Sequence, residues 1–159
     1  MLSIDSLIKQ TRTYRRFDES VAIDRLQIVR WLDIVRQTPS ARNAQPLKYI
    51  IITDTELCHE ITAKQHWASM LPEWDGPSVG ERPRAYLLQI LDTDIAPAAR
   101  FDEGIQLQAL GLLATEAGYG TCIFGGHGKA ELSRRLGLPT HLSINAIIAI
   151  GKPREEVVL

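Results

Sequence analysis

The sequence predicts a mixed fold of α-helices and β-strands, in the α/β or the α+β class. Four short runs of β-branched and apolar residues are typical of buried strands, and segments with apolar residues at helical spacing lie between them. Helical and strand segments alternate irregularly, without an internal repeat or a low-complexity tract. At 159 residues, the chain is most simply a single domain over residues 1–159.

The strands are expected where short apolar runs are bounded by turn-forming residues. They are residues 49–53, 85–91, 119–124 and 144–150. The last run is followed by Gly151-Lys152-Pro153, which we expect to end the strand.

The helices are expected from periodicity and from capping residues. They span residues 3–10, the segment after Asp24 up to Pro39, residues 55 to about 70, about 97–117 and 129–136. Ser3 and Asp24 are plausible N-caps, and Gly118 fits a left-handed glycine after the fourth helix. The second helix carries an apolar stripe that we expect to face the core: Leu26, Val29, Leu32, and Val35 or Ile34.

Residues 71–83 contain five prolines and glycines, so no regular element is expected there. This segment is the best candidate for a surface loop that covers a site.

Composition excludes several classes of function. The chain has 18 Lys and Arg against 19 Asp and Glu, a formal net charge of −1, so a general nucleic-acid or membrane-surface binder is not expected. Its apolar runs are far short of the ~20 residues of a membrane helix. Cys58 and Cys122 are too far apart for a metal motif and too few for a disulfide framework. We therefore expect a cytoplasmic protein with reduced thiols and with neither nucleic acid nor membrane as a partner.

Common catalytic and nucleotide-binding motifs do not occur. Gly118 and Gly120 lack the third glycine of the dinucleotide fingerprint, because Ile123 stands at that position. The four histidines show no metal-ligand spacing, and neither a Walker A lysine motif nor a Gly-x-Ser-x-Gly elbow is present. This pattern favours chemistry carried by a cofactor, with no metal and no protein nucleophile.

Residues 39–46, Pro-Ser-Ala-Arg-Asn-Ala-Gln-Pro, hold most of the functional signal and are called the central loop below. The two prolines stiffen it. Its hydroxyl, guanidinium and amide groups suit a planar anionic ligand with polar edges. An ordinary turn that satisfies its own backbone is an equally good interpretation of the composition alone.

The central loop resembles the Pro-Ser-x-x-Asn-x-Gln-Pro motif of the nitroreductase family of flavin enzymes. Residues 12–17, Arg-Thr-Tyr-Arg-Arg-Phe, are similar to the family's Arg-Ser-x-Arg-x-Phe segment. Residues 102–121 resemble its long central helix and the Gly-x-Gly-Thr turn that follows. The three matches occur in the family's order and reach from about residue 3 to Pro153.

The resemblance implies an α+β fold. The expected architecture is a mixed, mainly antiparallel sheet with helices on both sides, assembled as an intertwined homodimer that binds FMN at its interface.

The resemblance also assigns residues to FMN: Arg12, Thr13, Arg15, Pro39, Ser40, Arg42, Asn43, Gln45, Gly120 and Thr121. Arg12 and Thr13 would contact the phosphate and ribityl region, and Arg15 the N1 and O2 edge of the ring. Ser40, Arg42 and Asn43 would come from the partner subunit. Gly120 would let the backbone approach the flavin closely.

Trp67 precedes the Pro- and Gly-rich segment and Trp74 lies within it, and the two tryptophans have two interpretations. They form a lid over the substrate, or they anchor the segment to the core.

The implied function is that of an FMN-dependent oxidoreductase with a ping-pong mechanism. NADH or NADPH would reduce the flavin, and an electron-poor small molecule such as a nitroaromatic or a quinone would then be reduced. One alternative is a non-catalytic flavin-binding or regulatory module. Another is a flavin enzyme acting on a specialised metabolite, as related dehydrogenases and reductive dehalogenases do.

Three positions depart from the family's pattern. Thr11 stands where many relatives carry a basic residue, and Leu47 replaces a common tryptophan. The sequence stops at Leu159, short of the family's basic tail, so we expect a naturally short or truncated C-terminus with fewer phosphate contacts.

Overall fold

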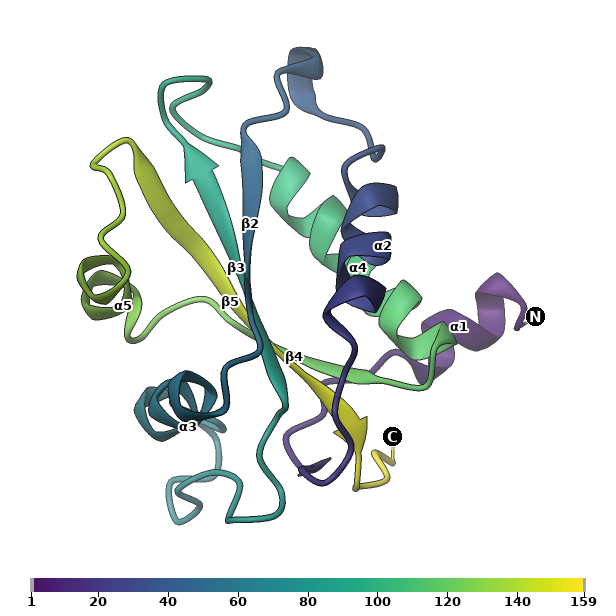
Figure 1. The fold of residues 1–159 in the computed structure, drawn as a ribbon. Coiled ribbons are helices and arrows are strands. Elements are labelled where there is room, and N and C mark those ends of the chain that lie inside the picture. Colours follow the sequence, from purple (N-terminus) through teal and green to yellow (C-terminus); the bar gives the residue numbers. More distant parts are fainter. Residues whose placement is uncertain (1, 159) are drawn as a thin grey trace.

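The structure is a computed structural model that describes residues 2–158. Its centre is a five-stranded sheet in which all pairings between the described strands are antiparallel (Figure 1). The strands are β1 (Phe17–Asp18), β2 (Leu47–Ile52), β3 (Ala85–Asp92), β4 (Gly120–Phe124) and β5 (Leu142–Pro153). β5 is the organising strand, because it pairs with β3 over most of its length and with β4 and β1 toward its C-terminal end.

Helices cover both faces of the sheet. They are α1 (Ile4–Gln10), α2 (Arg25–Val35), the 3₁₀ turn η1 (Ala41–Asn43), α3 (Thr55–Lys64), α4 (Asp102–Glu116) and α5 (Lys129–Arg135). α2 and α4 lie on one face, and α3 and α5 lie on the other (Figure 1). Within residues 2–158, no helix is long and apolar enough to cross a membrane.

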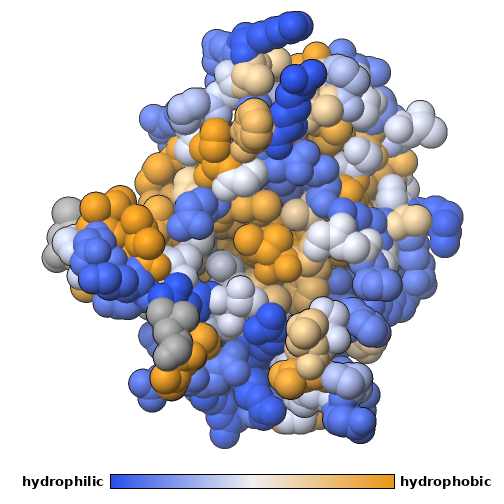
Figure 2. Space-filling view, turned by 180° about the vertical axis from the view of Figure 1, so that it is seen from behind, coloured by the Kyte–Doolittle hydropathy of each residue, from blue (hydrophilic) through white to orange (hydrophobic). Residues whose placement is uncertain are grey.

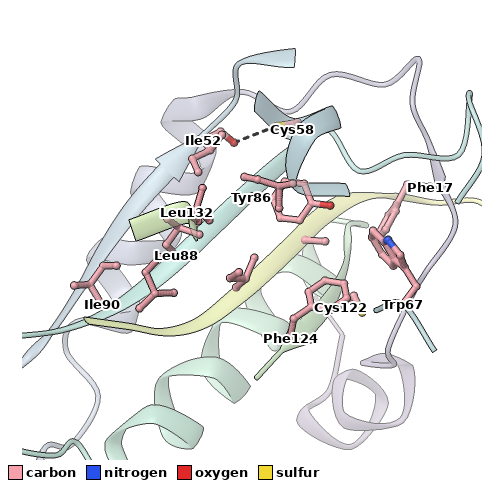
Figure 3. Close-up of a cluster of buried hydrophobic side chains, with 14 residues drawn as sticks. Phe17, Ile52, Cys58, Trp67, Tyr86, Leu88, Ile90, Cys122, Phe124 and Leu132 are labelled. Atoms are coloured by element: carbon pink, nitrogen blue, oxygen red, sulfur yellow. Dashed lines mark hydrogen bonds between the residues drawn. The ribbon is translucent and has the colours of Figure 1, made fainter. Parts of the chain in front are cut away.

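The two layers of helices explain why β3 is buried at all eight of its positions. Tyr86, Leu88 and Ile90 point into the core under α3 and α5, shown in Figure 3. Ala85 and Leu87 point into the core under α2 and α4. The predicted α+β fold with an antiparallel sheet and helices on both sides is thereby confirmed.

The predicted helix ends of α1, α2 and α4 carry the expected capping interactions. The side chains of Ser3 and Asp24 accept backbone N–H groups at 3.2 and 2.9 Å. Gly118 has φ 76°, and its N–H donates to the Thr115 carbonyl at 2.9 Å. These bonds satisfy polar groups that a helix end leaves without a partner.

Two helices are shorter than the sequence predicts. α3 ends at Lys64 instead of near residue 70, because Gln65 is extended and the indole N–H of Trp67 donates to the Thr62 carbonyl at 3.0 Å. α4 begins at Asp102 instead of near residue 97, since Arg100 has φ 55°, which a right-handed helix does not contain.

The buried face of α2 also differs from the predicted stripe. Val35 of the predicted stripe is buried and Leu32 packs against the core, but Leu26 and Val29 are 61% and 39% exposed, and Ile28 and Trp31 are buried in their place. Both sets have helical spacing, so periodicity alone does not say which one faces the sheet. α2 thus has a second apolar face at the surface.

β5 runs through Gly151 and Pro153, where we expected it to end. Phe17 and Asp18, not predicted as a strand, pair with Pro153 and Lys152. A Cβ on Gly151 would lie only 2.8 Å from Cδ1 of the buried Phe17 ring. The glycine therefore lets Phe17 cross the strand, and this packing outweighs the local tendency of the segment to break.

A matched pair of glycine substitutions tests this packing. Gly151→Ala is expected to lower the free energy of unfolding by about 1–3 kcal/mol, because the new methyl group overlaps Phe17. Gly104→Ala in α4 is expected to raise it by about 0.5–1 kcal/mol, because nothing lies within 4 Å of the added Cβ. Urea unfolding followed by circular dichroism measures both, and a Gly151→Ala protein as stable as the parent would contradict the assigned contact.

Candidate functional site

A cavity of ≈ 270 Å³, called the β4 cavity below, lies beside β4. The segment after α1, the segment after α3, and β4 with its following turn build its walls. Its lining includes Thr13, Arg15, Gln65, His66, Trp67, Cys122 and His127. Three residues predicted from the sequence, Thr13, Arg15 and Trp67, therefore meet here.

Backbone pairing with β4 holds the N-terminal part of this wall. Thr13 forms a parallel bridge with Thr121, and the N–H of Tyr14 donates to the Thr121 carbonyl at 3.0 Å. A Cβ on Gly120 would lie 2.5 Å from Cδ2 of Tyr14. The space left by Gly120 thus admits the Tyr14 ring of the same chain, and Arg12, half-buried, lies next to this pairing.

Arg15 is fixed at the cavity by two contacts. Its Nε donates to the carbonyl of Trp67 at 2.7 Å, and its backbone N–H donates to Glu155. Within residues 2–158, the terminal nitrogens of this guanidinium form no hydrogen bond or ion pair. They remain able to donate to a bound molecule.

Gln65 places a buried acceptor in the same wall. Its side chain is 7% exposed, and its Oε1 has no hydrogen-bond partner among the described residues. A buried polar atom without a partner is unfavourable, so a ligand donor would satisfy it. Arg15, a forked donor, and Gln65, which carries an acceptor without a partner among the described residues, therefore both line the β4 cavity.

Aromatic and sulfur side chains complete the cavity. The rings of His66 and His127 lie 5.1 Å apart with an interplanar angle of 35°. Burial raises the pKa of the Cys122 thiol to about 12, so this side chain is a neutral thiol at physiological pH. The cysteine contributes packing to the wall, not a thiolate.

The two tryptophans occupy different environments. Trp67 is 4% exposed and packs edge-on against Phe124 with ring centroids 4.9 Å apart, within the core of Figure 3. Trp74 is half-buried, and the guanidinium of Arg16 lies 5.2 Å from its ring centroid. Trp67 thus anchors the segment after α3, while Trp74 is partly buried and packs against the same core.

The central loop is held by Asp102, the first residue of α4. Ser40 Oγ donates to Asp102 Oδ2 at 2.6 Å, and the Ala41 N–H donates to Oδ1 at 3.0 Å. The N–H of Gln45 in turn donates to Ser40 Oγ at 2.9 Å. Arg42, Asn43 and Gln45 have φ of 57°, 54° and 53°, and their side chains are exposed.

The central loop lies at the Asp92 end of β3, whereas β4 pairs with the part of β5 nearer the other end of the sheet (Figure 1). The β4 residues that line the cavity, Cys122 to Phe124, are level with residues 86–88 of β3 through their common partners on β5. The N–H of Asp92, at the end of β3, donates to the carbonyl of Pro46 in the central loop. The four to six residue steps of β3 from this level to Asp92 span roughly 14–20 Å. One chain therefore does not bring the two predicted halves of the site together.

Three residues of these sites were missed by sequence reasoning. Gln65 was predicted to lie inside a helix, Asp102 was noted only as part of the segment that resembles the family's central helix, and Glu155 was given no role. Their local sequence does not show that their side chains act across long separations, as in the bond that the Arg15 N–H donates to Glu155. The one local signal is the position of Asp102 in the first turn of α4, where a carboxylate interacts favourably with the helix dipole.

Comparison with known proteins gives a consistent result. An iodotyrosine deiodinase of Thermotoga neapolitana is 26% identical over 171 residues, which cover 96% of this chain and 90% of the relative. An FMN-dependent nitroreductase from Clostridium difficile R20291 superposes with a TM-score of 0.80 at 18% identity, covering 97% of this chain and 90% of that chain. An iodotyrosine deiodinase bound to FMN and 3-iodo-L-tyrosine superposes with a TM-score of 0.77 at 22% identity, covering 99% and 97%.

The nitroreductase family model matches residues 8–89 and 85–152. These matches include the segment of Arg15, the central loop, α4 and β4. The chain therefore belongs to the nitroreductase family.

Proposed function

We propose that the protein is an FMN-dependent oxidoreductase that passes hydride from NADH or NADPH to an electron-poor acceptor, such as a nitroaromatic or a quinone. The two substrates would use the same site in turn. The observation that supports this proposal is that Arg15, with free guanidinium donors, and Gln65, whose Oε1 has no partner among the described residues, both line the β4 cavity.

These two groups fit the pyrimidine edge of a flavin. That edge has an N–H donor between two carbonyl acceptors, so it complements an acceptor beside a forked donor. When bound, the flavin supplies the hydride chemistry. Arg15 would hold the edge that gains negative charge on reduction, and its positive charge would favour the reduced ring.

A homodimer accounts for the separation between the β4 cavity and the central loop. A second copy related by two-fold symmetry brings one chain's loop to the other chain's cavity. Apolar side chains at the surface are available for such an interface: Ile4 and Ile8 of α1, Leu26, Val29 and Ile34 of α2, and Ile105 of α4. Figure 2 shows hydrophobic side chains at the surface on one face of the molecule.

The first test is flavin retention. After FMN addition and desalting, we expect an absorption band near ~450 nm that bleaches anaerobically with NADH or NADPH. Arg15→Ala should weaken FMN binding about ten- to a hundredfold or lower its reduction potential, because a charge-assisted hydrogen bond is lost. Arg36→Ala is the control, since Arg36 is exposed and pairs with Asp33 at 2.7 Å. Unchanged affinity and potential in Arg15→Ala would remove this role from Arg15.

Subunit complementation tests the shared site. Arg15→Ala and Asn43→Ala chains should each form impaired dimers. After mixing by unfolding and refolding together, about a quarter of all sites should carry neither substitution, because each mixed dimer has one intact site. Flavin occupancy and turnover should recover accordingly. If both substitutions act within one chain, mixing restores nothing.

Reductive dehalogenation is a second candidate, favoured by the 26% identity to the Thermotoga neapolitana iodotyrosine deiodinase across 96% of this chain. With reduced flavin, such an enzyme would release iodide from 3-iodotyrosine, whereas a nitroreductase would consume a nitroaromatic and leave iodotyrosine intact. Iodide release and acceptor consumption, measured with the same reduced protein, separate the two. Turnover of neither compound by a flavin that the nicotinamides do reduce would contradict both acceptor assignments.

A further inference from the structure

A second cavity of ≈ 290 Å³ lies between the central loop and the segment that leads into α4. Two arginines line it: Arg42 from the central loop and Arg100 from the segment before α4. Asp102 contributes to its wall, and the remaining lining is apolar, with Pro46, Ile95 and Pro97 among its residues.

Both arginines have left-handed backbone conformations. Arg42 has φ 57° and Arg100 has φ 55°, values that non-glycine residues adopt at a cost in free energy. Such conformations persist where the surrounding structure enforces them, and they concentrate at functional sites. Here the bonds from Ser40 and Ala41 to Asp102 fix the loop that carries Arg42 directly against the helix that follows Arg100.

The charge of this cavity is not balanced internally. Among the described residues, neither guanidinium forms a hydrogen bond or an ion pair, whereas Arg16 and Arg36 both pair with carboxylates. The single carboxylate in the wall, Asp102, uses both of its oxygens to accept bonds from Ser40 and Ala41. The cavity wall therefore carries two positive charges and one negative charge, and the carboxylate oxygens of that negative group already accept hydrogen bonds.

We propose that Arg42 and Arg100 form an anion-binding subsite for a carboxylate or phosphate group. Two guanidinium forks match the oxygens of either group, and the apolar walls suit the planar body of a small organic anion. In the proposed dimer the anion belongs either to the flavin, as its phosphate, or to the electron acceptor, as its carboxylate. The choice of source rests on the proposed function, but anion binding itself does not.

Direct titration of the flavin-free protein with benzoate and with inorganic phosphate, at constant ionic strength in chloride, tests the subsite. Isothermal calorimetry should detect saturable binding of one or both anions. Arg42→Gly and Arg100→Gly should each raise the dissociation constant about tenfold or more. Glycine removes the guanidinium and also relieves the positive φ, so these variants are expected to fold.

Two further variants serve as controls. Arg36→Ala should leave the affinity unchanged, because Arg36 lies on α2 and pairs with Asp33. Arg100→Lys keeps the charge but loses the fork, so an intermediate affinity is expected. An absence of binding to the parent protein, or equal affinities in all variants, would overturn the proposal even if flavin binds and turns over.

Two ratios identify the source of the anion: the affinity for FMN relative to riboflavin, and the KM for 4-nitrobenzoate relative to nitrobenzene. If Arg100→Gly weakens the binding of FMN but not the binding of riboflavin, the subsite holds the flavin phosphate. If it raises the KM for 4-nitrobenzoate but not for nitrobenzene, the subsite holds the acceptor's carboxylate. Either result supports the anion site and names its ligand, and a variant that changes neither ratio contradicts both of these assignments.

Discussion

The pairing of β5 on both of its edges is the constraint on which the rest of the structure depends. One edge carries β3 and hence the central loop, and the other carries β4. The C-terminal end of β5 also pairs with β1, which is possible because Gly151 leaves room for Phe17. The strand thereby fixes the N-terminal segment beside β4, and the guanidinium of Arg15 reaches the cavity as a consequence.

Most elements could be predicted because they depend on local signals, whereas the α+β class was predicted from the family resemblance. Ser3, Asp24 and Gly118 cap helices through interactions within a few residues, and β3 is mostly apolar because both of its faces are covered. The errors arose where distant contacts decide the outcome. The local sequence predicts that Gly151 ends the strand, but Phe17, far away in sequence, packs against it and the strand continues.

The candidate site was predictable in its residue types but not in its geometry. Motif resemblance selected Thr13, Arg15 and the central loop, since those residue types suit a flavin. It did not select Gln65, whose unpartnered oxygen has meaning only once the wall of the β4 cavity is assembled. Nor did it indicate that Asp102 holds the central loop, because that bond joins residues far apart in the sequence.

The distribution of positive charge links the proposed dimer to its ligands. A chain with a formal net charge of −1 nevertheless carries guanidinium groups without carboxylate partners at both the β4 cavity and the Arg42–Arg100 cavity. If two-fold association brings such groups together, their repulsion opposes the dimer until an anion lies between them. An anion that contacts both chains then binds the dimer more tightly than the separate chains. By mass action, its binding must stabilise the dimer, so occupancy of the flavin site and association of the subunits are thermodynamically coupled.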